Sequence, residues 1–349
     1  MKNRKALIAM SGGVDSSVAA YLTQQEGLTC VGGTMKLLCT DSADAEDARA
    51  VATRLGMEFH IFQMQDTFRR EVMDKFVHCY EMGLTPNPCV DCNRKLKFGA
   101  LLEAALELGC DYVVTGHYGR ILRHPETGRY QLCKAADPAK DQSYFLYGLT
   151  QHQLAHTRFP LGGLTKEEAR QIAQEQGFIN ARKRDSQDIC FIPGGDYMEF
   201  IREHTGKTYP GGDFLDASGN IVGRHQGAIG YTRGQRKGLG LAMGQPVYVL
   251  EKDMQRNTVT VGSNDALFTT TLIAEDWNFM PFERLTAPLP CLAKARSRMT
   301  EQPVTAYPME DGRVKVVFDQ PQRALTTGQA VVLYDGDAVI GGGTIVEVL

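Results

Sequence analysis

The feature that most constrains the fold is a short polar loop, Ser11–Ser17, set between an apolar run and a helical pattern. Residues Ala6–Met10 form a continuous apolar run, which predicts a buried strand. After the loop begins, apolar residues recur with helical spacing from Val14 to Leu22, so we expect a helix packed on that strand. Two adjacent glycines in the loop let the backbone turn sharply and approach a ligand closely. The chain therefore opens with a strand–loop–helix unit whose helix N-terminus can face an anion.

The alternation of strands and helices continues along the first third of the chain. We expect further strands at residues 30–35, 58–62 and 112–115, and helices at residues 45–55, 72–80 and 93–108. Right-handed crossovers would make these strands a parallel sheet with helices on both faces, which is a doubly wound α/β fold. Ligands in such sheets bind beyond the C-terminal ends of the strands, where the Ser11–Ser17 loop and Gly116-His117 both fall.

The rest of the first half carries two further signals. Thr165 and Glu168 form a capping box for a helix that ends at Gly177. The segment Ser186–Pro193, which contains Cys190, predicts a last strand of this domain.

The second half of the chain has the pattern of β structure. Short alternating runs separated by glycine-rich turns begin after about residue 205, and Asp311-Gly312 marks a hairpin. The interval Ala266–Trp277 is where this half divides. We therefore expect an α/β domain over residues 1–204, a small β-rich middle domain over residues 205–272 and a C-terminal β-barrel over residues 273–349.

Composition argues against a membrane protein or a secreted one. Of the 349 residues, 43% are apolar and 23% charged, and no apolar run approaches the roughly 20 residues that cross a bilayer. The apolar stretch after the basic N-terminus is too short for a signal peptide, so we expect a cytoplasmic protein with mostly reduced cysteines. Because the net charge is −3, contact with nucleic acid would depend on local basic clusters. The candidate clusters are Arg182–Arg184, Arg233–Lys237 and Lys294–Arg298.

The glycine-containing loop is suited to bind phosphate. Hydroxyl groups on Ser11, Ser16 and Ser17 add donors to the helix N-terminus, and the loop lacks the Gly-Lys-Ser/Thr ending of a Walker A motif. It resembles instead the pyrophosphate loop of the N-type ATP pyrophosphatases, which have an adenine nucleotide alpha hydrolase-like fold. That resemblance implies that ATP is cleaved between its α and β phosphates and that AMP is placed on a substrate oxygen. Adenylation makes the oxygen of a C=O group a good leaving group, so the loop predicts the activation chemistry but not the nucleophile.

Separated thiol groups suggest a sulfur nucleophile. Thr85–Pro88 is rigid because its two prolines fix the backbone, and Cys89 and Cys92 follow where the next helix begins. A helix N-terminus lowers the pKa of a thiol and favours the thiolate. A cysteine on an apolar strand, such as Cys190, is more often a core residue. A Cys-x-x-Cys pair can be half a zinc site or a redox pair, but no second such pair or His pair completes a zinc site in this sequence.

The complete set of motifs resembles one family, the bacterial tRNA-specific 2-thiouridylases. The matching stretches run from the N-terminus into the middle domain: Ala9–Ser16, Thr85–Pro88, Cys92-Asn93, Lys97-Phe98, Thr115–Tyr118, Lys140–Leu146, Asp188–Ile192 and Gly234–Gly240. The barrel matches more weakly, through Lys294–Arg298 and Gly328-Gln329.

The resemblance implies roles for the matched residues. Cys190 would carry sulfur as a persulfide that attacks C2 of an adenylated uridine, and Cys92 would cleave the S–S bond and leave a Cys92–Cys190 disulfide. ATP, with Mg²⁺, would be bound by Ala9, Met10, Ser11, Gly12, Gly13, Val14, Asp15, Ser16, Met35 and Gly116. The target base would be met by Asn87, Pro88 and Cys89, and the rest of the tRNA by His117, Lys140, Asp141, Gln142, Ser143, Arg296, Ser297 and Gln329.

The resemblance also implies partners. The substrates would be the tRNAs for Lys, Glu and Gln with uridine at the wobble position. The sulfur donor would be a cysteine desulfurase or a persulfide relay protein. We expect the protein to be a monomer.

Position 89 departs from the family pattern. Many family members carry Asp where this chain has Cys89, so an acid–base role at this position does not transfer. The three thiols of Cys89, Cys92 and Cys190 could instead hold a [4Fe–4S] cluster with one open iron for external sulfide. Two other functions stay open on sequence alone. One is an amidating ATP pyrophosphatase synthetase with a nitrogen nucleophile, and the other is a non-catalytic sulfur carrier or tRNA-binding protein.

Overall fold

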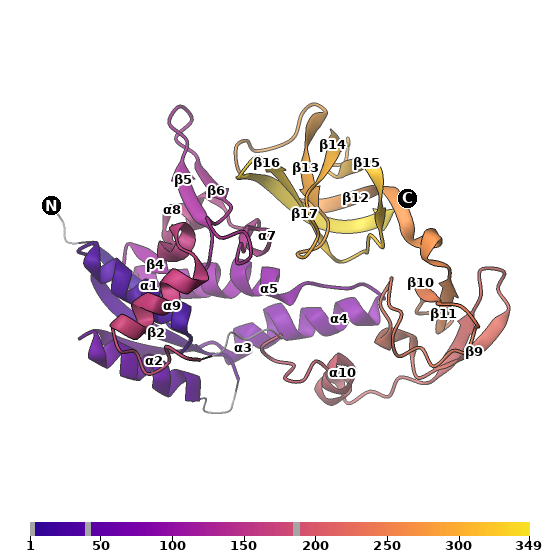
Figure 1. The fold of residues 1–349 in the computed structure, drawn as a ribbon, viewed down its shortest axis with the longest axis horizontal. Coiled ribbons are helices and arrows are strands. Elements are labelled where there is room, and N and C mark those ends of the chain that lie inside the picture. Colours follow the sequence, from indigo (N-terminus) through magenta and orange to yellow (C-terminus); the bar gives the residue numbers. More distant parts are fainter. Residues whose placement is uncertain (1–3, 39–42, 184–188) are drawn as a thin grey trace.

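The structure is a computed structural model that describes residues 4–38, 43–183 and 189–349. Figure 1 shows an elongated molecule with a parallel sheet at one end and a small second sheet at the other. The C-terminal barrel lies above the helices that run between these two ends (Figure 1). The expected architecture, an α/β domain followed by two β-rich parts, is confirmed.

The N-terminal sheet has five parallel strands in the order β3-β2-β1-β4-β7. Its strands are β1 (Lys5–Ala9), β2 (Thr29–Lys36), β3 (Glu58–Gln63), β4 (Tyr112–Val114) and β7 (Thr157–Arg158). The predicted strands are confirmed, and β1 pairs in parallel with both β2 and β4. Because β1 is central and covered on both sides, Ala6, Leu7 and Ile8 are fully buried, which explains the continuous apolar run.

Helices cover both faces of this sheet. The relevant helices are α1 (Val14–Gln25), α2 (Ala43–Arg54), α6 (Leu101–Glu107) and α9 (Lys166–Glu175). Ala6 and Ile8 pack in one apolar cluster with α1, α2 and α9, whereas Leu7 packs in another with α6. Alternate side chains of a strand point to opposite faces, so the doubly wound arrangement is confirmed. The predicted capping box of α9 is present, with the Thr165 hydroxyl accepting from the Glu168 amide.

Two longer helical segments extend from the sheet toward the middle domain (Figure 1). The first consists of α3 (Gln65–Phe68), η1 (Arg69–Asp74) and α4 (Lys75–Glu81), and the second of α5 (Pro88–Asp91), η2 (Cys92–Ala100) and α6. Helix was predicted in both places, but η1 and η2 are π-helices. A π-helix differs from an α-helix in its backbone hydrogen bonds, which no residue type specifies.

The predicted last strand of this domain is wrong. Residues 189–193 form turns, with the Ile192 amide donating to the Ile189 carbonyl at 2.8 Å, and residues 186–188 lie outside the described part. Gly194 and Gly195 follow with left-handed φ values of 87° and 77°, which turn the chain. The edge of the sheet is instead the two-residue strand β7, which is too short to give a periodic signal.

The second half of the chain forms a small sheet and a closed barrel. The small sheet, in the order β10-β11-β8-β9, contains β8 (Gly212–Leu215), β9 (Ile221–His225), β10 (Tyr248–Asp253) and β11 (Thr258–Gly262). The barrel contains β12 (Phe268–Phe279), β13 (Leu289–Lys294), β14 (Gln302–Pro308), β15 (Val314–Arg323), β16 (Ala330–Asp335) and β17 (Ala338–Val348). It closes because β12 pairs with both β15 and β17. The predicted hairpin at Asp311-Gly312 joins β14 to β15, with Gly312 at φ 83°.

A hairpin of the α/β domain joins the barrel, which the sequence did not predict. It consists of β5 (Arg120–Arg123) and β6 (Tyr130–Cys133), and Cys133 pairs with Ala338 of β17. The apolar cluster beneath this junction contains Leu132 of the hairpin, Phe98 of η2 and Tyr334 of the barrel. The α/β domain and the barrel therefore share a core, which fixes where the barrel sits.

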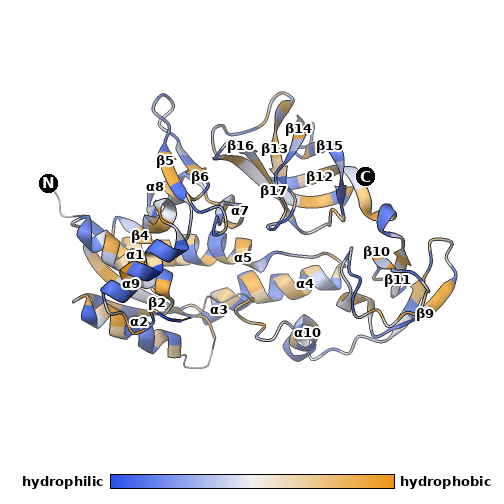
Figure 2. Cartoon of the chain, in the orientation of Figure 1, coloured by the Kyte–Doolittle hydropathy of each residue, from blue (hydrophilic) through white to orange (hydrophobic). Residues whose placement is uncertain are grey.

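Hydropathy along the helices follows this packing. Hydrophilic and hydrophobic residues alternate along the helical ribbons in Figure 2, as expected of helices with one buried face. Within the described residues, no helix is both long enough and apolar enough to span a bilayer.

Candidate active site

The Ser11–Ser17 motif follows β1 at the C-terminal edge of the sheet, as predicted: Ser11–Gly13 lie in the connecting loop, and Val14–Ser17 are the first residues of α1. The Ser16 hydroxyl donates to the Gly13 carbonyl at 3.0 Å and accepts from the Ser11 amide at 3.3 Å, so the loop is held by its own side chains. Gly12 has a left-handed φ of 70°, and a Cβ there would collide with the Asp44 carbonyl oxygen. Gly13 caps α1 without a side-chain hydrogen bond, which leaves the helix N-terminus suited to an anion.

Two other predicted nucleotide residues flank this loop on the neighbouring strands. Met35 lies near the end of β2, where the Thr34 hydroxyl donates to the Met10 carbonyl at 2.7 Å. Gly116 follows β4, and a Cβ on it would lie 2.6 Å from the Asp15 carbonyl carbon and 2.7 Å from the Ser16 nitrogen. The structure thus brings the predicted ATP residues together, and only glycine fits at position 116.

The carboxylate of Asp15 is held by residues distant in the sequence. Lys166 Nζ, at the start of α9, lies 2.8 Å from both carboxylate oxygens, and the Tyr118 hydroxyl donates to Oδ1 at 2.9 Å. The Lys166 side chain is 6% exposed and that of Asp15 is 30% exposed. A buried ammonium group requires an anionic partner, so this pair fixes the orientation of Asp15 at the loop. Sequence reasoning missed Lys166, because the capping box marked its helix but not the group that its ammonium meets.

A second set of contacts anchors the loop from the other side. The Gly12 carbonyl accepts from Asn180 Nδ2 at 3.0 Å and from Lys183 Nζ at 3.3 Å. Lys183 also contacts Asp44 at 2.7 Å and Asp47 at 2.6 Å. Lys183 belongs to a basic cluster considered for tRNA phosphates, but its ammonium is bound to groups at the nucleotide loop. Asn180 is buried and gave no signal in the sequence.

The two predicted catalytic cysteines come together although they are far apart in the sequence. Cys92, at the start of η2, packs in one apolar cluster with Phe191 and Ile192, the neighbours of Cys190. The Phe191 ring makes edge-on contacts with the rings of Phe76 and Phe68, at centroid distances of 5.4 and 5.6 Å, respectively. Cys92 is buried and Cys190 is exposed, and both are free thiols. This arrangement suits an outer thiol that is loaded from solution and an inner thiol that acts after it.

The expected lowering of thiol pKa values is not found. Burial raises the pKa of Cys92, and it raises the pKa of Cys89 although that residue lies in the first turn of α5. Cys190 is solvent-accessible, yet the surrounding protein raises its pKa to about 11, and the thiols of Cys92 and Cys89 add to this effect. The cost of placing a thiolate among apolar groups therefore outweighs the helix N-terminus. The charge of Lys97 acts in the opposite direction at all three thiols.

His117 lies inside the α/β domain rather than on its surface. Its ring packs against Phe98 and Phe159, each at a centroid distance of 5.7 Å. Nδ1 lies 2.7 Å from the Thr115 hydroxyl and Nε2 lies 3.4 Å from Lys97 Nζ. Burial, together with the charge of Lys97, holds the pKa of His117 well below its usual range, so the ring is neutral. The structure thus places this predicted tRNA residue next to Lys97.

The predicted tRNA segment Lys140–Ser143 lies at the junction with the barrel. Asp141 accepts from the Ser143 hydroxyl at 2.7 Å, and the Gln142 side chain accepts from the Tyr118 amide at 2.9 Å. Ser143 is fully buried, and its hydroxyl lies 3.4 Å from that of Tyr334. Ser143 thus meets the barrel, and Gln142 meets Tyr118, whose hydroxyl binds Asp15 of the nucleotide loop.

The predicted base-contacting residues Asn87–Cys89 adjoin the barrel residue Gln329. Gln329 Nε2 donates to the Thr85 carbonyl at 2.9 Å, and the Thr85 amide donates to the Thr327 carbonyl at 3.0 Å. Arg296 donates to the Thr326 hydroxyl at 2.8 Å and to the Ala324 carbonyl, and half-buried Ser297 follows it. Asn87 caps α5, and Pro88 is its buried first residue. The segment that precedes α5 and the barrel segment that holds Gln329 are therefore joined by hydrogen bonds.

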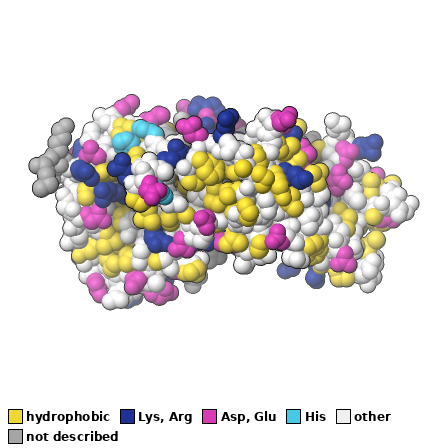
Figure 3. All heavy atoms as spheres, turned by 90° about the horizontal axis from the view of Figure 1, so that it is seen from above, with side chains coloured by type: hydrophobic (Ala, Val, Ile, Leu, Met, Phe, Trp, Pro, Cys, Tyr) yellow, Lys and Arg dark blue, Asp and Glu magenta, His cyan; other side chains and the backbone are white. Residues whose placement is uncertain are grey.

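Basic side chains do not form one continuous surface on the face shown in Figure 3, where acidic groups lie among them. At the junction of the middle domain and the barrel, however, three arginines lie near one another. Burial lowers the pKa of Arg296 most, and the positive charges of Arg323 and Arg233 lower it further. Arg323 also lies 3.4 Å from the Gly234 carbonyl. The structure thus brings the predicted basic clusters Arg233–Lys237 and Lys294–Arg298 together beside Arg323. Arg323 itself was not predicted from the sequence.

Metal binding by the three thiols finds no support in their arrangement. Across the part of the chain that the structure describes, no three Cys, His, Asp or Glu side chains converge closely enough to hold a metal ion. Cys89, Cys92 and Cys190 are therefore not arranged to ligate a single metal ion.

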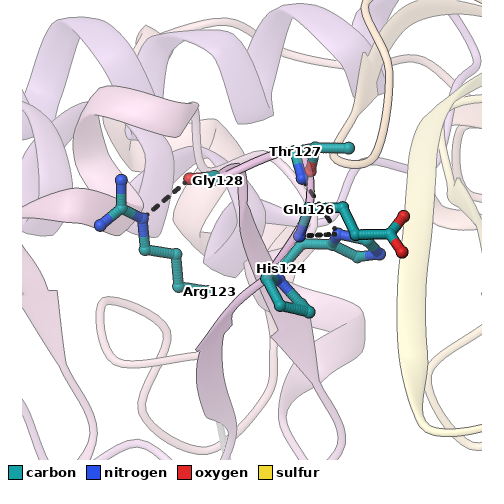
Figure 4. Close-up of a pocket in the computed structure, with 6 residues that line it drawn as sticks. Arg123, His124, Glu126, Thr127 and Gly128 are labelled. Atoms are coloured by element: carbon teal, nitrogen blue, oxygen red, sulfur yellow. Dashed lines mark hydrogen bonds between the residues drawn. The ribbon is translucent and has the colours of Figure 1, made fainter.

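A hollow of about 390 Å³ lies elsewhere, at the tip of the β5–β6 hairpin (Figure 4). It is lined by Arg123–Gly128, where His124 Nδ1 accepts from the Glu126 and Thr127 amides at 3.3 Å each. These bonds close the turn itself. The hollow contains no thiol and no residue of the nucleotide loop, so it is not the catalytic site.

Family models match almost the entire chain. They are the tRNA methyl transferase HUP domain over residues 4–194, the tRNA methyl transferase PRC-barrel domain over residues 198–263 and the Aminomethyltransferase beta-barrel domain over residues 269–345. The chain is 45% identical to the tRNA-specific 2-thiouridylase MnmA of Clostridioides difficile, with 98% of each chain covered. It is 47% identical to the tRNA-specific 2-thiouridylase MnmA of Symbiobacterium thermophilum, with 98% of this chain and 92% of that one covered. The chain belongs to the tRNA-specific 2-thiouridylase family.

Membership of the 2-thiouridylase family confirms the resemblance drawn from the motifs and sets the amidating synthetases aside. Among solved structures, a 4-thiouridine synthetase–RNA complex with bound ATP is 18% identical, with a TM-score of 0.37. The alignment covers 58% of this chain and 50% of that one. A likeness this distant does not bear on mechanism.

Proposed function

We propose that this chain is an ATP-dependent tRNA-uridine 2-sulfurtransferase that acts on the wobble uridine of the tRNAs for Lys, Glu and Gln. The observation that carries the proposal is the joint placement of an exposed Cys190 and a buried Cys92 on a domain with a pyrophosphate-type loop. Membership of the 2-thiouridylase family gives this arrangement its substrate class.

The first step activates the uridine. The C2 oxygen attacks the α-phosphorus of ATP, the bond to the β-phosphate breaks, and pyrophosphate leaves with its electron pair. The N-terminus of α1 and the Ser11 and Ser16 hydroxyls are suited to hold the phosphates. Mg²⁺, when bound with ATP, supplies charge neutralisation at the phosphates. The Lys166–Asp15 pair holds the Asp15 carboxylate in place at the start of α1.

The second step transfers sulfur. The terminal sulfur of a Cys190 persulfide attacks C2, and AMP leaves with the electrons of the C–O bond. The Cys92 thiolate then attacks the Cys190 sulfur, and the S–S electrons go to the sulfur on C2, which yields 2-thiouridine. The resulting Cys92–Cys190 disulfide takes two electrons from an external dithiol before the next turnover. The exposure of Cys190 supports reloading by a cysteine desulfurase or a relay protein.

The test is mass analysis of unmodified tRNA after incubation with the enzyme, ATP, L-cysteine, a cysteine desulfurase and a dithiol. We expect the mass gain of one oxygen-to-sulfur exchange, with one pyrophosphate released per thiolated tRNA. Cys92→Ser and Cys190→Ser should abolish thiolation, whereas Cys291→Ser, a half-buried barrel thiol, should not. Absence of tRNA-dependent pyrophosphate release from the wild type would contradict the proposal and favour a non-catalytic carrier.

A further inference from the structure

The helix that begins at Cys92 is a π-helix over nine residues, Cys92–Ala100. The Leu101 amide at its end donates to the Leu96 carbonyl, which is a bond across five residues. In an α-helix each residue rotates by about 100°, so residues i and i+5 lie on different faces. Bonding from i to i+5 widens the turn and reduces the angle between these two residues around the helix axis. Lys97 is five residues after Cys92, so the wider turn of η2 brings these two positions closer together around the helix than an α-helix would.

The ammonium of Lys97 is held by a neutral histidine. Lys97 Nζ lies 3.4 Å from His117 Nε2, and His117 Nδ1 lies 2.7 Å from the Thr115 hydroxyl. An ammonium group only donates, so Nε2 is the acceptor and Nδ1 carries the proton that faces Thr115. The buried His117 ring is wedged between two phenylalanines, which fixes the direction from which it meets Lys97.

The charge of Lys97 reaches every thiol of the site. It favours the thiolate at Cys89, Cys92 and Cys190, where burial disfavours it. Within residues 4–38, 43–183 and 189–349, the other charged or titratable groups that act on these thiols are Asp91 and the thiols themselves, and they disfavour the thiolate. Among the side chains that the structure describes here, Lys97 is thus the shared source of positive charge.

We propose that Lys97 is the cation of the sulfur-transfer site, placed by η2 and held by His117 so that its ammonium stabilises negative charge on the sulfur atoms of Cys92 and Cys190. The inference rests on the proposed function, in which a persulfide anion and then a Cys92 thiolate attack. Each attack moves negative charge through a largely apolar environment, where an unpaired anion is costly. Lys97 acts through its charge, and His117 is a positioning residue that acts through Lys97.

The experiment measures charge selectivity at the thiols, without tRNA or ATP. The reduced full-length enzyme is alkylated with neutral iodoacetamide or anionic iodoacetate, and the rates at Cys92 and Cys190 are read by peptide mass spectrometry. A nearby ammonium attracts the anionic reagent, so Lys97→Gln should lower the iodoacetate-to-iodoacetamide rate ratio by about three- to tenfold. Lys97→Arg should keep the ratio. Lys95→Gln is the matched control, since Lys95 is an exposed lysine on the same helix.

A purely structural role for Lys97 would change both alkylation rates together and leave their ratio unchanged, and that result would overturn the proposal. Lys97→Met, which keeps an unbranched apolar stem and removes the charge, is measured instead if the Gln variant does not fold. In the full reaction, Lys97→Gln should lower thiolation by at least about tenfold with little change in pyrophosphate release. Failure of the wild type to thiolate tRNA would contradict the proposed function, whereas the alkylation ratio tests Lys97 separately.

Discussion

Gly116 offers the sharpest test of the nucleotide loop. A Cβ at this position would lie 2.6 Å from the Asp15 carbonyl carbon, and an ordinary contact begins at 3.4 Å. Gly116→Ala would therefore displace the start of α1 by about 0.8 Å, the difference between these two values. Because a misplacement of about 1 Å can cost a factor of about 100 in rate, we expect ATP-dependent pyrophosphate release to fall by about 10- to 100-fold. That loss corresponds to about 1.4–2.7 kcal/mol of transition-state stabilisation.

The assay is tRNA-dependent pyrophosphate release at saturating tRNA, with tRNA affinity measured in parallel. Affinity for tRNA should change little, since the collision lies at the nucleotide loop. Gly163→Ala is the matched control, because nothing lies within 4 Å of a Cβ there, and it should behave as the wild type. A Gly116→Ala enzyme that releases pyrophosphate within twofold of the wild-type rate would refute the assigned close approach.

Three further changes test other contacts. Lys166→Met should lower the free energy of unfolding, measured with urea, by about 2 kcal/mol and the rate of pyrophosphate release by about tenfold, because the partly exposed Asp15 carboxylate loses its ammonium partner. Adding Asp15→Asn to this variant should recover part of the lost stability. Cys89→Ser, purified without oxygen, should retain substantial thiolation with a persulfide donor. Equal inactivity of Cys89→Ser and Cys92→Ser, with stoichiometric iron and sulfide in the wild type, would contradict the persulfide route. Arg298 is exposed, and Arg298→Glu should reduce the slope of log binding constant against log salt concentration for tRNA by about one unit. If tRNA binding by the wild type does not depend on salt, the predicted contact with the tRNA phosphate backbone is wrong.

Prediction succeeded where a signal depends on neighbouring residues. The apolar run at residues 6–10 and the left-handed Gly12 belong to one continuous stretch of sequence, so the strand–loop–helix unit could be predicted from local patterns. The capping box at Thr165 succeeded for the same reason. Prediction failed at residues 189–193, because apolar residues there serve a turn that packs on other rings rather than a strand in a sheet.

The sequence by itself determined the nucleotide loop, the thiol motif and the family, since each resides in the order of nearby side chains. Only the tertiary structure decided that Lys166 meets Asp15 across 151 residues, and that the surroundings of Cys190 pack on Cys92. Only the tertiary structure revealed that Cys92–Ala100 is a π-helix and that Lys97 meets the buried His117. The physical reason is that such contacts depend on how whole elements pack and on which backbone carbonyl each amide reaches, and neither is a property of a short run of residues.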